Sequence, residues 1–284
     1  MLYLILRPYV RIILHFFANV RIILHFFAKN WTYTNIQNIP KSGPVLLAST
    51  HPNSFFDAMF LAVTLRRRIW SLARGDAFRK NWVKRLLTSL YMMPVHRLSE
   101  GKEHLGDNDD TFNKCYELFQ KNEMVLIFSE GLCTNQTELL PLKKGTARLA
   151  QKVWQDGIDL KVVPLGLTYD SFDKFGKKIN ANVGQVIQKT DFEEVSSGGL
   201  FLKNFNQKLE TQLKSLISHQ FSANTNLIYY LAYIFNFPVY ALCTAVSRKL
   251  TKGTVFFDSI AFALMIFLLP IYWVLLVVIL CIFV

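Results

Sequence analysis

A histidine and an aspartate stand six positions apart in the apolar stretch LLASTHPNSFFDAMFL, residues 46–61. A neutral imidazole can accept a proton near pH 7, and a neighbouring carboxylate can orient the ring and stabilise the imidazolium that results. Residues six apart on one helix would point about 120° away from each other. His51 and Asp57 can therefore pair only if the histidine precedes the helix and folds back. Pro52 favours this arrangement, because it restricts the residue before it to an extended conformation.

The same residues also admit interpretations without catalysis. Ser54 and Asp57 fit a capping box, with Ser54 as the N-cap and the carboxylate facing the positive end of the helix. A lone histidine in apolar surroundings is more often a hydrogen-bonded core residue than a catalyst. A hydrolase that uses Ser54 as its nucleophile is disfavoured, because no Gly-x-Ser-x-Gly turn surrounds this serine and the three residues are too close in sequence to form a triad readily.

Short apolar runs alternate with helical patterns over residues 31–224. This pattern predicts an α/β domain with a mostly buried mixed sheet flanked by helices. His51 follows the first run, so the end of a strand would hold it. The predicted strands cover residues 44–49, 69–74, 92–97, 124–130 and 161–169. The predicted helices cover residues 55–65, 80–91, 109–121, 145–154 and 199–220.

Both ends of the chain predict attachment to a membrane. Residues 1–30 place Arg, His and Lys at four-residue spacing among Ile, Leu and Phe, which is typical of a basic amphipathic helix on a membrane surface. VRIILHFFA occurs twice in this segment, and we assign the duplication no function. Residues 225–284 hold two apolar stretches joined by the loop SRKLTKGT and predict a membrane-embedded helical hairpin. Pro238 and Pro270 interrupt the stretches, so the hairpin could also be partial or lie in the membrane plane.

The charge distribution indicates a partner with negative charge. The 284 residues carry a net charge of +12, and nine lysines and arginines stand between Arg66 and Arg97 with the single acid Asp76. The chain has no recognisable nucleic-acid-binding motif, so we expect no nucleic acid partner. Its apolar ends favour an anionic membrane surface or a phosphorylated small molecule, with a solvated basic face as the simpler alternative. Four scattered cysteines predict neither a metal site nor a disulfide framework and fit a reducing, cytosol-facing location.

Four short blocks, THPNSFFDA, MMPVHR, FSEG and VVPLGL, occur in this order between residues 40 and 170. In order and spacing they resemble the blocks of the glycerolipid acyltransferases, a family that includes the lysophosphatidic acid acyltransferases. The resemblance implies an α/β domain at a membrane surface that moves a fatty acyl group from acyl-CoA or acyl carrier protein to an acceptor hydroxyl, with no further cofactor. The partners it implies are membrane lipids and the acyl donor. From the cysteine pattern we expect the active site to face the cytoplasm. The acceptor we expect is lysophosphatidic acid, with glycerol 3-phosphate or a hydroxylated or amino-acid lipid as alternatives.

The resemblance also implies roles for individual residues. His51 would take the proton from the acceptor hydroxyl as that oxygen attacks the thioester carbonyl, and Asp57 would orient the imidazole. Arg97 would bind the acceptor phosphate. Glu130 and Gly131 would organise the acceptor site. In the fourth block, the Pro and Gly at positions 164 and 166 would shape the acyl-donor side.

The sequence departs from the family pattern in two blocks. Five residues lie between the histidine and the aspartate of the first block, where four are usual. The third block usually reads Phe-Pro-Glu-Gly-Thr-Arg, but here Ser129 replaces the proline and Leu132-Cys133 replaces the last two residues, so a phosphate-binding arginine is missing.

Three cations further along could replace the missing arginine. Lys143, Lys144 and Arg148 stand at the predicted start of a helix, whose N-terminus would add to their attraction for phosphate. They could equally contact lipid headgroups. A membrane tether without catalysis would explain the basic faces and apolar ends, but it would not explain four ordered blocks.

Overall fold

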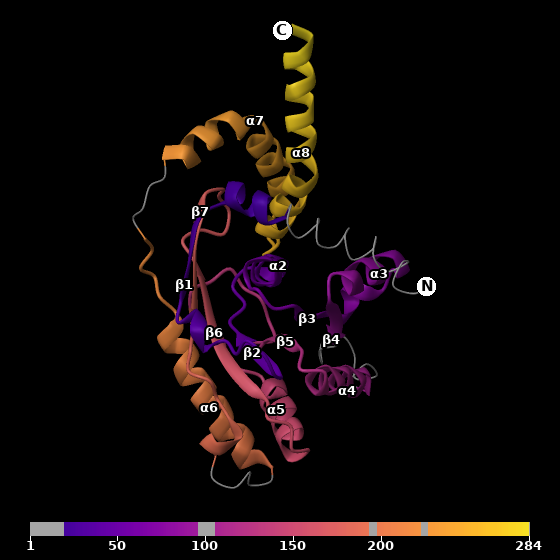
Figure 1. Ribbon diagram of the computed structural model, residues 1–284, viewed down its shortest axis with the longest axis vertical. Helices are drawn as coiled ribbons and strands as arrows, with labels where there is room; N and C mark the ends of the chain where they lie inside the picture. Colours follow the sequence, from indigo (N-terminus) through magenta and orange to yellow (C-terminus); the bar gives the residue numbers. More distant parts are fainter. Residues whose placement is uncertain (1–19, 96–105, 193–197, 223–226, 284) are drawn as a thin grey trace.

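The computed structural model describes residues 20–95, 106–192, 198–222 and 227–283. Within these ranges a seven-stranded sheet in the order β1-β7-β6-β2-β5-β3-β4 carries helices on both faces (Figure 1). The strands are β1 (Ala28–Thr34), β2 (Val45–Ser49), β3 (Ile69–Arg74), β4 (Met92–Val95), β5 (Met124–Phe128), β6 (Lys161–Tyr169) and β7 (Lys177–Val183). The helices are α2 (Ser54–Thr64), α3 (Asn81–Ser89), α4 (Gly106–Gln120), α5 (Gly145–Gln155), α6 (Gly199–Leu216), α7 (Leu227–Leu250) and α8 (Phe257–Phe283).

The sheet is mixed, as the sequence predicts. Strands β6, β2, β5, β3 and β4 run parallel to one another. Strand β7 is antiparallel to β6, and β1 is parallel to β7. The sequence patterns did not predict β1 and β7. Their sequences, AKNWTYT and KKINANV, are rich in polar residues, and β1 is only partly buried along most of its length, so neither gives the apolar run of a central strand.

Alternate side chains of β2 enter two separate cores. Val45 and Leu47 belong to a core shared with α2, α7 and α8. Leu46 and Ala48 belong to a core on the opposite face, shared with α4, α5 and α6. All five residues of β2 are buried, as expected for a central strand covered on both faces. The position of the loop that follows β2 is therefore fixed by packing on both sides.

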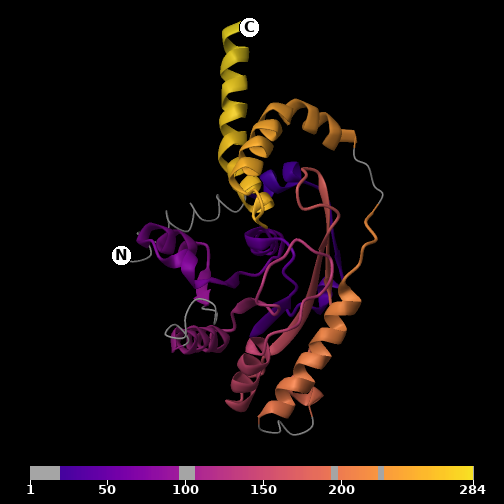
Figure 2. The same cartoon turned by 180° about the vertical axis from the view of Figure 1, so that it is seen from behind.

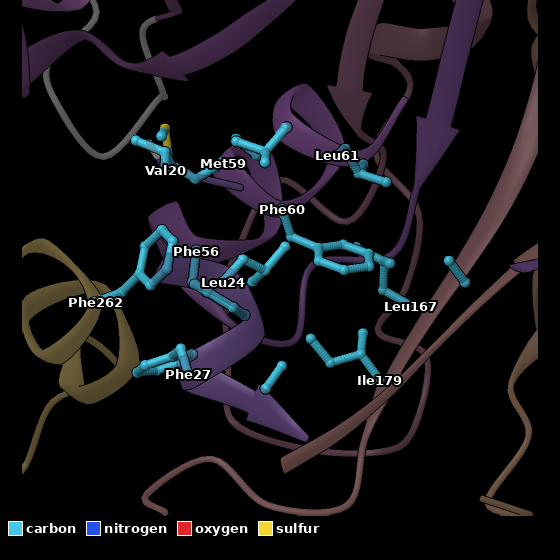
Figure 3. Close-up of a cluster of buried hydrophobic side chains, with 14 of the residues drawn as sticks. Val20, Leu24, Phe27, Phe56, Met59, Phe60, Leu61, Leu167, Ile179 and Phe262 are labelled. Carbon is cyan, nitrogen blue, oxygen red and sulfur yellow. The ribbon is translucent and has the colours of Figure 1, made fainter. Parts of the chain in front are cut away.

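Residues 20–27 pack against the domain core. Residues 20–27 are helical, with Leu24 and Phe27 buried among the side chains of α2 and β7 (Figure 3) and Arg21 exposed. The chain continues at Ala28 as β1, so the boundary predicted at residue 30 falls inside a strand. The rest of the predicted amphipathic helix, residues 1–19, lies outside the described ranges.

Helices α7 and α8 are each long and apolar enough to cross a membrane, judged by length and composition. Both continue through a proline, Pro238 in α7 and Pro270 in α8, and α7 follows a curved path (Figure 1). The two ends of α8 differ: residues such as Phe262 and Met265 are buried in the domain core, whereas residues 274–282 are largely exposed. Figure 1 and Figure 2 both show the C-terminal half of α8 projecting away from the rest of the protein.

Candidate active site

The loops that follow β2 and β5 meet at one edge of the sheet. The two strands are parallel neighbours, in register from Val45 opposite Met124 to Ser49 opposite Phe128. The chain leaves β2 towards β3 on one side and leaves β5 towards β6 on the other. In open α/β sheets, ligands bind at the carboxyl ends of strands at such a reversal point. His51 and Glu130 each stand two residues beyond their strand, so both lie at this edge.

His51 and Asp57 form the pair that their spacing allows. His51 precedes α2, and its Nδ1 lies 2.9 Å from Oδ2 of Asp57. The side chain of Asp57 is fully buried, whereas 14% of the His51 side chain is exposed. The imidazole also stacks on the ring of Phe128, the last residue of β5, with 3.7 Å between ring centroids and 10° between ring planes. The carboxylate at Nδ1 favours the tautomer with its proton there, which leaves Nε2 to accept a proton from a substrate.

The carboxylate of Asp57 receives two further hydrogen bonds. The backbone N–H of Asn53 donates to Oδ2 at 2.8 Å, and the hydroxyl of Tyr169, at the end of β6, donates to Oδ1 at 2.6 Å. Burial, together with the charge of Asp57, raises the pKa of Tyr169 well above its ordinary value, so this hydroxyl keeps its proton and acts as a donor. These donors compensate the buried carboxylate and fix its orientation towards His51.

The start of α2 differs from the predicted capping box. The N-cap is Asn53, not Ser54, which is the first helical residue and has a φ of +54°. The backbone N–H of Ser54 donates to Sγ of Cys133 at 2.8 Å. Asp57 does take part in the cap, because its carboxylate accepts the N–H of Asn53. Only the acidic half of the predicted box is therefore present, and with Asn53 as the N-cap the acid stands at the fourth helical residue instead of the third.

Glu130 supports His51 from the neighbouring loop. Its Oε1 accepts the backbone N–H of His51 at 2.8 Å, and its Oε2 accepts the backbone N–H of Leu140 at 2.9 Å. The side chain is buried; burial raises the pKa of Glu130, while the two N–H donors oppose this shift. Both oxygens are thus engaged by main chain, and Glu130 joins the His51 loop to the segment around Leu140.

The cations predicted to replace the missing arginine lie where α5 begins. Lys144 is the N-cap of α5, and Lys143 and Arg148 are exposed beside it. The stem of Lys143 packs against Gly131, whose φ is +66° and whose missing Cβ would lie 2.9 Å from Lys143 Cγ. This contact brings one of the three cations to the Glu130 loop.

The other predicted residues are distributed differently. Arg97 lies two residues beyond β4, outside the described ranges, so its role stays a prediction. Gly166 allows the end of α6 to pack closely on β6, because a Cβ there would lie 2.7 Å from Cβ of Leu216. Pro164 pairs with Ala48 in the same central part of the sheet. These two residues have a structural role in the fold.

One cation of the basic segment between Arg66 and Arg97 makes hydrogen bonds within the protein. Arg67 donates to the carbonyl oxygens of Pro40, Gly43 and Asn122, so this cation fixes loops at the amino ends of the strands. A surface hollow lined in part by Pro40 and Gly43 lies at that same edge, opposite His51, and takes no part in the site. Over the described ranges, no three His, Cys, Asp or Glu side chains are grouped in a way that could hold a metal ion.

Comparison with known proteins agrees with this geometry. Residues 30–168 match the family model named Acyltransferase. The crystal structure of the 1-acyl-sn-glycerophosphate (LPA) acyltransferase PlsC from Thermotoga maritima superposes with a TM-score of 0.52 over 73% of this chain and 81% of that chain, at 13% sequence identity, which shows a common fold. No curated protein sequence matches the chain. The resemblance to the glycerolipid acyltransferases is confirmed, and the segment that holds the His51 site belongs to the acyltransferase family.

Proposed function

We propose that this acyltransferase is a membrane-bound O-acyltransferase that moves a fatty acyl group from acyl-CoA or acyl carrier protein to the hydroxyl of a glycerolipid acceptor. The observation that carries the proposal is the His51–Asp57 pair at the carboxyl edge of the sheet, with Nδ1 engaged and Nε2 left to act as a base. The acceptor we favour is lysophosphatidic acid, which is the class of substrate in the name of the structural neighbour.

The chemistry follows from the two nitrogens of one imidazole. Nε2 of His51 takes the proton of the acceptor hydroxyl as its oxygen forms a bond to the thioester carbonyl carbon. The imidazolium formed is stabilised through Nδ1–H by Asp57. When the tetrahedral intermediate collapses, the C–S bond breaks and the leaving thiolate takes the proton back from Nε2. The products are the ester and the free thiol, and no acyl-enzyme is required.

A phosphorylated acceptor fits the charges around the site. Lys143 is held at the Glu130 loop by the contact of its stem with Gly131. Lys144 and Arg148 add positive charge at the first turn of α5, whose N-terminus also favours an anion. Arg97, which follows β4 in the sequence, is a further residue that we propose to bind the phosphate, because an arginine fork suits that group.

Two surfaces support membrane attachment, and we propose that the site faces the cytoplasm. Helices α7 and α8 expose many large apolar side chains. On α3, Trp82 and Leu86 lie one turn apart and are 67% and 50% exposed, with Lys80, Lys84 and Arg85 exposed around them. An exposed aromatic and aliphatic pair surrounded by cations is typical of a helix at an anionic membrane surface.

The test is acyl transfer by the full-length protein in detergent micelles. The purified protein is incubated with acyl-CoA or with acyl carrier protein that carries a thioester-bound acyl group, and with a panel of acceptors: glycerol 3-phosphate, lysophosphatidic acid and other lysophospholipids. Free thiol is measured and the products are identified by mass. We expect a diacyl product from lysophosphatidic acid. His51→Ala should abolish transfer and leave the circular dichroism spectrum and micelle binding unchanged.

Two results would count against the proposal. Unchanged transfer by the His51→Ala variant would refute the mechanism. An absence of thiol release with every acceptor and both thioester donors would favour a non-catalytic lipid-binding tether.

A further inference from the structure

A buried ion pair lies beneath the loop that carries His51. Lys177 of β7 contacts Asp258 in the first turn of α8, and neither side chain is exposed to solvent. Oδ2 of Asp258 also accepts a hydrogen bond from Nδ2 of Asn53 at 2.6 Å. Oδ1 of Asp258 has no hydrogen-bond partner among the described residues. A single oxygen of α8 therefore joins the ammonium group to the His51 loop.

Asn53 contacts both Asp258 and the proposed catalytic pair. Its backbone N–H donates to Oδ2 of Asp57 at 2.8 Å, and that oxygen is the one that Nδ1 of His51 approaches at 2.9 Å. Asn53 is fully buried, so its side chain and its backbone are both fixed. A continuous series of polar contacts thus runs from α8 to the imidazole.

A second contact of α8 holds the start of α2. The backbone N–H of Phe56, in the first turn of α2, donates to Oγ of Ser259 at 3.2 Å. The side chain of Asn53 makes no capping hydrogen bond to α2, so a serine from another helix satisfies one of the N–H groups left free at this helix end. The rings of Phe56 and Phe262 pack at 5.2 Å between centroids (Figure 3), which fixes the distance between the two helices.

The ion pair is poorly explained by stability alone. Burial lowers the pKa of Lys177, and the charge of Asp258 opposes that effect. A buried ion pair can often be replaced by apolar residues of similar size without loss of stability, because desolvation offsets the attraction between the charges. Buried polar groups of this kind can instead specify one arrangement of the parts that they join. Here the parts joined are α8, β7 and the His51 loop.

We propose that Asp258 and Lys177 are positioning residues of the active site: Oδ2 of Asp258, held by the ammonium group of Lys177, fixes Asn53 and through it the orientation of Asp57 towards His51. Helix α8, which we propose to attach the protein to the membrane, is by this contact also part of the support of the active site. The expected effect on kcat rests on the proposed function. The expected effect on the position of the His51 loop rests on the contacts alone.

Two double variants separate the hydrogen bond from the ion pair. Lys177→Met with Asp258→Leu removes both charges and the acceptor of the Asn53 hydrogen bond. Lys177→Met with Asp258→Asn also removes both charges but keeps a side-chain oxygen that can accept from Asn53. Neither variant leaves an unpaired buried charge, which single substitutions would do. Asn53→Ala removes the donor of the same hydrogen bond. It replaces the leucine variant in the experiment if that variant fails to fold.

The experiment measures kcat, KM for the acyl donor and hydrogen–deuterium exchange of residues 51–57, in full-length protein in micelles. We expect the leucine variant to lose kcat by about tenfold or more, the factor that follows from losing one hydrogen bond to a charged group, with KM for the donor unchanged. Exchange in residues 51–57 should accelerate more than exchange in the strands of the sheet, because the lost hydrogen bond is local to this loop. The asparagine variant should lose less kcat than the leucine variant and exchange more slowly, because it keeps an acceptor for Asn53 although it lacks the ammonium group that holds this acceptor.

The outcomes decide the inference whether or not the proposed function holds. Unchanged kcat and unchanged exchange in both the leucine variant and Asn53→Ala would overturn it. Equal losses in the leucine and asparagine variants would also overturn it, because the hydrogen bond would then make no difference. If the unchanged protein transfers no acyl group, the proposed function fails, and the exchange of residues 51–57 still decides whether α8 holds the loop.

Discussion

Glu130→Gln tests whether this residue acts through the His51 loop or on the acceptor. The glutamate accepts two backbone N–H groups, those of His51 and Leu140, with one oxygen each. A glutamine has one carbonyl oxygen, so its NH2 group must face one of the two N–H donors. One buried N–H is then left without an acceptor, at a cost of about 1–3 kcal/mol.

Glu130→Gln should change kcat more than it changes the melting temperature. Burial raises the pKa of Glu130, which means that the charged carboxylate carries a desolvation cost that a neutral amide avoids. This difference offsets part of the lost stability, and the melting temperature should change little. The geometry of His51 has no such compensation. If the full cost falls on the transition state, kcat drops about 5- to 150-fold, with KM for the acceptor nearly unchanged.

The assay is steady-state transfer with varied acceptor concentration in mixed micelles. The matched control is Glu138→Gln, the same chemical change at an exposed residue of the same loop, and it should have no effect on kcat. A higher KM for the acceptor with unchanged kcat would refute the reasoning, because it would mean that the carboxylate binds substrate directly.

Three further predictions concern the same site. Tyr169→Phe removes the donor to Oδ1 of Asp57, a hydrogen bond worth about 1.5–3 kcal/mol for a charged acceptor, so the melting temperature should fall by several degrees; an unchanged value would mean that the hydroxyl does not stabilise the carboxylate. Phe128→Leu removes the ring stacked on His51, worth about 0.5–1.5 kcal/mol, and should lower kcat by about 2- to 12-fold, whereas an unchanged kcat would show that the stack does not orient the imidazole. Because the pKa of Glu130 in the folded protein is raised above 4.5, the folded state binds this proton more tightly than the unfolded state does. The melting temperature of the unchanged protein, relative to that of Glu130→Gln, should therefore rise as pH falls from neutral through the raised pKa and level off below 4.5; a relative decrease would contradict the sign.

The central strands could be predicted because they are buried on both faces. Residues 161–169 form β6 and residues 69–74 form β3, within the predicted bounds, since a continuous apolar run identifies such strands. Strand β7 gives no such run, because Lys177 occupies a fully buried position. A buried lysine is acceptable there only because Asp258 lies against it, and that partner is 81 residues away in the sequence. No local pattern could have indicated it.

In the candidate site, too, the residues with a local sequence signal could be predicted and their distant partners could not. His51 and Asp57 were identified because their spacing and the intervening Pro52 are local features. Tyr169, which also contacts Asp57, comes from a strand 112 residues further along, and an ordinary tyrosine at the end of an apolar run gives no functional signal. The prediction of Ser54 as N-cap was wrong, because the preceding residue, Asn53, takes the N-cap position and directs its side chain to α8 instead.

The same long-range contacts decide where the catalytic domain ends. Composition places a boundary at residue 225, because the chain becomes apolar beyond it. In the structure the first turns of α8 lie inside the core of the domain, with Asp258 and Phe262 buried against α2 and β7. Composition cannot distinguish an apolar residue that faces lipid from one that faces a protein core, since both environments favour the same side chains. The polar residue Asp258 at the start of an apolar helix is the one sequence feature that separates them, because an acid of this kind needs a protein partner. In a helix that starts this way, the first turns should therefore be assigned to the domain, and the membrane segment should begin beyond them.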